Sequence, residues 1–134
     1  MARGPTLIGA AVLAVLIAGG GYVANQLQAH RHLTARVEAL TGGDPERGKA
    51  AMVRRPCGSC HEAPGLAGAQ GKVGPPLTHF AHRAYIGGRV ANTPENLIQW
   101  IEDPHVIDPQ SAMPPMGIGE HEARDIAAYL YTLG

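Results

Sequence analysis

The chain has 134 residues, with 11 basic and 11 acidic side chains, so its formal net charge is zero. This balance gives no support for nucleic-acid binding, which depends on an excess of basic residues. Phe, Tyr and Trp make up only 4% of the chain, which is too few for a well-filled aromatic core, and the length predicts one domain with room for an appendage.

The first predicted element is an apolar, uncharged stretch from Pro5 to Ala24. As a helix, such a stretch is about 30 Å long, which matches the hydrocarbon core of a bilayer. A cleaved signal peptide is the alternative, but Tyr22-Val23-Ala24 is a poor cleavage site. We therefore expect residues 1–25 to be a single retained transmembrane helix.

Residues 26–43 are predicted to form a juxtamembrane helix and linker. Leu33, Val37 and Leu40 follow at helical spacing, and Thr41-Gly42-Gly43 supplies the glycine that is typical of a helix end. The triplet Gly19-Gly20-Gly21 is expected to loosen the outer end of the preceding membrane helix, because glycine disfavours helix.

Asp44-Pro45-Glu46 opens the next predicted helix, with a capping aspartate, a proline at the first position and an acid in the first turn. The helix is expected to run to about Arg55 and to end before Pro56. Gly48 is unfavourable inside a helix, which suggests that another helix comes close at this point. Simple tolerance of one glycine is the alternative.

Cys57-Gly58-Ser59-Cys60-His61 is the attachment pattern of a covalently bound c-type haem. On one helical turn the positions i, i+3 and i+4 share a face, so both thiols can reach porphyrin vinyl groups while His61 binds the iron. A thioredoxin-like pair of cysteines is the alternative, but it leaves His61 unused and no strand pattern precedes the motif. The motif thus predicts one haem c, attached through Cys57 and Cys60.

A carbonyl partner for His61 is predicted in Gly74-Pro75-Pro76-Leu77. The two prolines hold the backbone extended and leave their carbonyls free. Because a metal-binding histidine usually donates its other N–H to a carbonyl or carboxylate, Pro75 is the candidate acceptor.

The second axial ligand is predicted in the proline-rich loop that contains Met113-Pro114-Pro115-Met116. A residue before proline is held extended, and a thioether presented in this way suits haem iron. Met113 is the candidate sixth ligand, and Met116, a histidine such as His105, or an open site are the alternatives.

Two further helices complete an all-α prediction. Thr93-Pro94-Glu95 opens a helix that ends near Asp103, and its apolar face carries Trp100, the single tryptophan, as a core residue, a neighbour of the haem, or both. The last helix runs from Glu120 to Leu133, and no strand pattern of useful length appears.

Basic side chains gather in residues 44–89 and acidic ones in residues 95–125. Arg54 and Arg55 precede the cysteines, so they could steer an acidic docking face toward the haem edge. An ordinary solvated surface is the alternative. Arg89 is a candidate partner for a haem propionate, because a guanidinium binds carboxylates bidentately.

This order of parts resembles class I cytochromes c over residues 44–134, the predicted haem domain. The resemblance implies a helical fold with His61 and Met113 as axial ligands and Pro75 as the acceptor for His61. It also implies that the first and last helices cross with Gly48 under Tyr129, and that Trp100 lies beside the haem. The residues that carry the resemblance are Gly48, Cys57–His61, Gly74–Leu77, Leu97–Ile101 before Asp103-Pro104, Met113-Pro114 and Ala128-Tyr129-Leu130. One departure is Met52, which stands where the family often has an aromatic side chain.

With an anchor added, the resemblance is to membrane-tethered members of that family found with respiratory complexes. A haem with both axial positions filled has no site for substrate, and His/Met ligation raises its potential. We therefore expect a non-enzymatic carrier or complex subunit that moves single electrons from a quinol-oxidising complex or dehydrogenase to a terminal oxidase.

The expected partners are redox proteins and, through residues 5–24, membrane lipid. Since covalent haem attachment in bacteria takes place outside the cytoplasmic membrane, the haem domain is expected on the periplasmic face. A haem enzyme or gas sensor with a labile Met113, using His79, His82 or His105 as an acid–base group, is the alternative. A mainly structural subunit is a third possibility.

Overall fold

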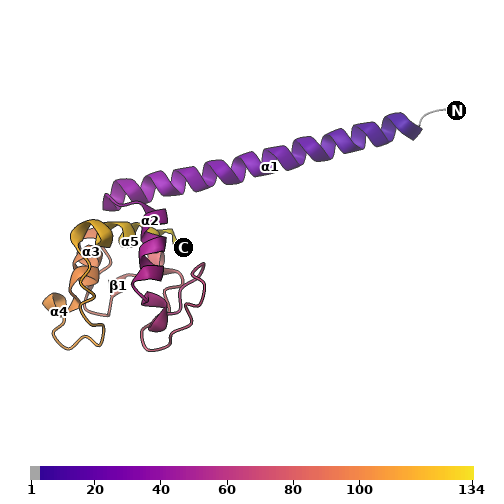
Figure 1. Cartoon of the computed structure of the whole chain (residues 1–134). Helices are drawn as coiled ribbons and strands as arrows, with labels where there is room; N and C mark the ends of the chain where they lie inside the picture. Colours follow the sequence, from indigo (N-terminus) through magenta and orange to yellow (C-terminus); the bar gives the residue numbers. More distant parts are fainter. Residues whose placement is uncertain (1–3) are drawn as a thin grey trace. The chain divides into compact units, whose positions relative to one another are not determined.

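The computed structural model describes residues 4–134, so the first three residues of the predicted anchor lie outside the described residues (Figure 1). Contacts within the chain divide it into two units, one ending at Leu33 and one comprising Thr34–Gly134. The domain boundaries predicted at residues 25/26 and 43/44 stay predictions.

Helix α1 (Gly4–Thr41) makes up the first unit and continues into the second. The apolar side chains of Ile8, Leu13 and Ile17 are each more than half exposed. By length and composition α1 could cross a membrane, and none of its apolar window is buried. The helix is continuous through Gly19–Gly21, so the expected loosening there does not appear as a break.

The helices of the second unit begin at the residues that the capping patterns predict. Helix α2 (Pro45–Arg54) is capped by Asp44, whose side chain accepts a hydrogen bond from Arg47 N at 2.8 Å. Helix α3 (Pro94–Glu102) is capped by Thr93 in the same way, and helix α5 covers Glu120–Thr132. The three main helices of the haem domain thus start where the sequence predicts.

Two short strands, a short helix and a 3₁₀ turn at Phe80–His82 were not predicted. Strands β1 (Tyr85–Ile86) and β2 (Val90–Ala91) form an antiparallel hairpin, which turns at Gly87 and Gly88 with φ of 55° and 69°. Strands of two residues are too short to show a period of two in the sequence. Helix α4 (Pro104–Ile107) lies in the predicted loop, where the Asp103 side chain accepts from His105 N at 2.9 Å. The fold is nevertheless mostly helical, as predicted.

Helix α2 packs chiefly against α5, which in turn packs against α3. Gly48 lies directly against the α5 backbone, since a Cβ there would overlap the Asp125 carbonyl and lie 2.9 Å from Ile126 N. The predicted close approach is therefore confirmed. The nearest atoms of α5 belong to the backbone of Asp125 and Ile126, and the predicted position of Gly48 under Tyr129 stays a prediction.

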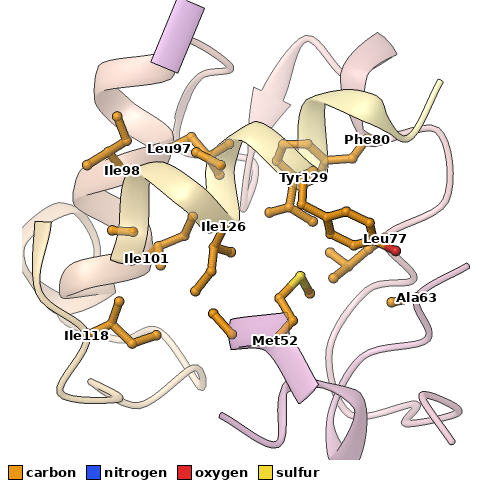
Figure 2. Packing of buried hydrophobic residues seen from close by; sticks show 14 of the residues in the cluster. Met52, Ala63, Leu77, Phe80, Leu97, Ile98, Ile101, Ile118, Ile126 and Tyr129 are labelled. Carbon is orange, nitrogen blue, oxygen red and sulfur yellow. The ribbon is translucent and has the colours of Figure 1, made fainter. Parts of the chain in front are cut away.

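The core between these helices is mainly aliphatic. Met52 is 2% exposed and points from α2 toward Ile126 and Tyr129 of α5 (Figure 2). Tyr129 also donates its hydroxyl to Pro64 O at 2.7 Å. A flexible methionine therefore fills the place where the resembling family often has an aromatic side chain.

The last turn of α1 is part of this packed unit. Val37 and Thr41 are buried, and Thr41 O accepts a hydrogen bond from Arg124 Nη1 at 3.0 Å. A Cβ at Gly43 would overlap the backbone of Arg124, so the chain runs directly against α5. The end of the predicted linker is thus a packed segment.

Candidate haem site

The cysteine–histidine motif forms a single tight turn directly after α2. A 3₁₀ turn covers Cys57–Ser59, and Cys57 O accepts hydrogen bonds from Cys60 N at 3.2 Å and from His61 N at 3.0 Å. Two further bonds, Gly71 N to Gly58 O at 3.1 Å and Gly74 N to Cys60 O at 2.8 Å, fasten the following loop to the turn. The motif follows a helix, which argues against the thioredoxin-like alternative.

The His61 ring is oriented by the segment that the sequence singled out. Its Nδ1 lies 2.8 Å from Pro75 O. A carbonyl oxygen can only accept, so Nδ1 carries the proton and Nε2 keeps its lone pair for a metal. Gly74 lies against the ring, and a Cβ there would overlap it. The predicted contact with Pro75 is therefore present.

The two thiols are half-buried beside this turn. Burial raises the pKa of the Cys57 thiol. The Cys57 side chain also packs against the apolar core, and its Sγ lies 3.6 Å from Arg55 O. Cys57, Cys60, His61 and Pro75 thus form one hydrogen-bonded unit.

The methionine loop is a separate segment between α4 and α5. Met113 N donates to Ser111 Oγ at 3.2 Å, and Ser111 O lies 3.0 Å from Nε2 of His105. Met116 packs against the apolar core, whereas Met113 is a half-buried residue of the loop. His105 and Met116 thus both have other contacts, and Met113 as the sixth ligand stays a prediction.

Trp100 and Arg89 each have a partner in the described chain. The half-buried Trp100 ring packs against the core cluster and lies over Gly87, where a Cβ would come within 2.5 Å of it. Arg89 Nε donates to Asp108 Oδ2 at 2.9 Å. Their proposed positions at the haem and its propionates stay predictions.

The structure reveals a cluster that the sequence reasoning missed. Arg55 donates to Glu122 Oε2 through Nη2 at 2.7 Å and Nε at 3.1 Å, and Arg54 Nη2 lies 3.3 Å from Glu122 Oε1. Hydrogen bonding from Arg55 lowers the pKa of Glu122. Both arginines of the predicted docking rim are thus paired with one acid of α5. The sequence signal that could have indicated this pairing was an acid, Glu122, in the first turn of the last helix, together with Arg54 and Arg55 at the end of α2.

These donors fit a haem c. The thiols of Cys57 and Cys60 and the imidazole of His61 belong to one turn. The thioether of Met113 lies in the loop between α4 and α5 of the same unit. The surrounding core is apolar, as a porphyrin requires.

A family model described as "Cytochrome c" matches residues 45–134. Cytochrome c oxidase subunit 2 of Alkalihalophilus pseudofirmus is 31% identical over 102 residues, which are 75% of this chain and 29% of that protein. The chain therefore spans less than a third of that relative's length. No solved structure matches the chain. The long apolar N-terminal helix is consistent with a membrane-anchored protein. Because the family model covers most of the sequence, the chain belongs to the cytochrome c family, whose domain implies haem c and electron transfer rather than catalysis.

Proposed function

We propose that the chain is a membrane-tethered monohaem cytochrome c that carries single electrons toward a terminal oxidase, either between respiratory complexes or as a subunit of one. The observation that carries this proposal is the Cys57–His61 turn, in which the Pro75 carbonyl holds Nδ1 of His61 and leaves Nε2 for iron. The bound haem supplies a one-electron iron couple.

Each donor has a defined task in this proposal. Cys57 and Cys60 would hold the haem through two thioether bonds. His61 would bind the iron, and the hydrogen bond to Pro75 fixes its ring orientation. Met113 would supply the second protein ligand, which would raise the potential and close the iron to small molecules. A closed iron suits transfer of electrons through the haem edge.

The likeness to an oxidase subunit supports a place in respiration. The relative is a cytochrome c oxidase subunit 2, and the similarity extends over 75% of this chain but only 29% of the relative. The electron acceptor is therefore a terminal oxidase, and the donor is a quinol-oxidising complex or a dehydrogenase. The haem domain lies on the periplasmic face of the bacterial inner membrane, with α1 in the lipid.

Ligand assignment is the direct test. We would purify the full chain in mild detergent as the wild type and as Met113→Ala and Met116→Ala. The near-infrared methionine–iron band of the ferric protein and carbon monoxide binding by the ferrous protein would be recorded. We expect the band in the wild type and in Met116→Ala, and its loss with rapid carbon monoxide binding in Met113→Ala.

Two outcomes would contradict the proposal. Loss of the band in Met116→Ala alone would move the ligand to Met116. A wild type without the band that binds carbon monoxide rapidly would instead support a haem enzyme or gas sensor. Identifying the proteins that copurify with the haem from native membranes would then name the donor and the acceptor.

A further inference from the structure

Arg55 joins three segments of the haem domain. It follows the last residue of α2, two positions before Cys57, and its Nε and Nη2 both bind Glu122 in the first turn of α5. Its remaining nitrogen, Nη1, lies 3.4 Å from Met116 O in the methionine loop. Because the guanidinium is planar and rigid, the two bonds to Glu122 determine where Nη1 points.

The loop that Arg55 reaches is irregular, and its contacts with the apolar core are made by Met116 and Ile118, downstream of Met113. Residues 108–119 contain no helix or strand. Upstream, Met113 N is bound to Ser111 Oγ at 3.2 Å. Downstream, Pro114 and Pro115 have fixed φ angles, which limits how far the Met113 backbone can move independently of the Met116 carbonyl. A contact at Met116 O therefore restricts the backbone positions open to Met113.

We propose that Arg55, oriented by Glu122, is a positioning residue that holds the Met113 thioether at its ligand position through the Met116 carbonyl. This inference rests on the proposed function, since it takes Met113 as the sixth ligand. The bond at 3.4 Å is long, and the side chains of Arg55 and Glu122 are 37% and 21% exposed. The hydrogen bond from Arg55 to Met116 O should therefore affect how often the methionine loop opens more than it affects the free energy of unfolding of the whole domain.

Arg54 provides a matched control within the same cluster. It also binds Glu122, through Oε1 at 3.3 Å, and has the same charge. Within the described residues, the Arg54 side chain bonds Glu122, whereas the Arg55 side chain also bonds Met116 O. Arg54→Gln thus removes a charge and an ion pair beside the haem motif while the bond from Arg55 to the loop is kept.

The experiment compares the full chain in detergent as the wild type, Arg55→Gln, Arg55→Lys, Arg54→Gln and Met113→Ala. It measures the rate of carbon monoxide binding to the ferrous protein, which requires Met113 to leave the iron, together with the thermal unfolding midpoint. We expect Arg55→Gln to bind carbon monoxide about five- to tenfold faster than the wild type, as loss of one hydrogen bond predicts. Arg54→Gln should stay within about twofold, and Arg55→Lys should fall between because an ammonium keeps the charge but lacks the fork.

Equal rates in Arg55→Gln and Arg54→Gln would overturn the inference, because charge alone would then explain the effect. A lower unfolding midpoint in Arg55→Gln with an unchanged rate would overturn it too, since Arg55 would then only stabilise the fold. If Arg55→Gln yields no haem protein, Glu122→Gln takes its place, and an unchanged rate there is likewise a refutation. A wild type that binds carbon monoxide as fast as Met113→Ala would refute the proposed function itself, and the two failures are therefore distinguishable.

Discussion

Replacing Gly48 by alanine tests the crossing of α2 and α5 directly. A Cβ at this position would overlap the Asp125 carbonyl and lie 2.9 Å from Ile126 N. These neighbours are backbone atoms of a helix, so no side chain can rotate away to make room. The two helices would have to separate locally, although their contact is the main one in the haem domain.

Two effects of opposite sign decide the size of the change. Alanine is favoured over glycine in a helix interior by about 1 kcal/mol. Overpacking a rigid contact costs up to about 3 kcal/mol. We therefore expect Gly48→Ala to lower the free energy of unfolding by about 2 kcal/mol, which corresponds to a midpoint lower by roughly 10 °C in a domain of this size.

The assay is thermal and denaturant unfolding of the full haem-loaded chain in detergent, followed by helix signal and haem absorbance. Ala50→Gly is the matched control, because Ala50 is an exposed residue of the same helix and its replacement changes helix preference alone. The control should cost about 1 kcal/mol. A Gly48→Ala protein as stable as the wild type, or more stable, would refute the close approach.

Three more substitutions or conditions test other parts of the domain. Burial raises the pKa of Asp125, but hydrogen bonds from Arg47 and the Asp44 N–H outweigh this and leave it below its usual 3.8, and the pKa of Glu122 lies below 4.5. The ionised carboxylates of Asp125 and Glu122 therefore stabilise the fold fully above their ordinary pKa values, and this stabilisation is lost as the pH falls through their lowered pKa values. The difference in unfolding midpoint between the wild type and Asp125→Asn should accordingly narrow below about pH 4. Gly74→Ala would displace the His61 ring that Gly74 contacts, and the purified protein should contain less haem per chain by absorbance. Asn92→Ala removes side-chain bonds of 3.1, 3.0 and 2.9 Å and should cost about 2 kcal/mol in denaturant unfolding, and an unchanged midpoint would count against this role.

Local signals account for what the sequence predicted well. The caps at Asp44 and Thr93 act within one turn of their own helices, and proline follows each of them. The Cys57–His61 turn is likewise closed by bonds between residues of the motif. Pro75 was identified because an extended Pro-Pro segment offers carbonyls and no N–H groups, which is again a local property.

The features that the sequence did not predict depend on contacts between distant segments. The register of Gly48 against Asp125 is set by how two helices cross, and a helical pattern indicates only that a face is buried. The pairing of Arg55 with Glu122 follows from that same crossing. The basic charge of Arg54 and Arg55 was visible in the sequence, but their pairing with one acid, Glu122, was not.

The crossing of α2 and α5 also bears on how the two proposed ligands, His61 and Met113, would be brought to one haem. His61 follows α2 through the attachment turn, and Met113 precedes α5 in the loop that ends at Gly119. Each proposed ligand is thus connected to one of the two helices, so we expect the distance between the ligands to depend on how closely the helices approach. Gly48 sets that approach near one end of α2, while Arg55 and Glu122 tie the other end to α5 and to the loop. If Met113 is the ligand, as proposed, a substitution that separates these helices should therefore weaken that ligation before it unfolds the domain.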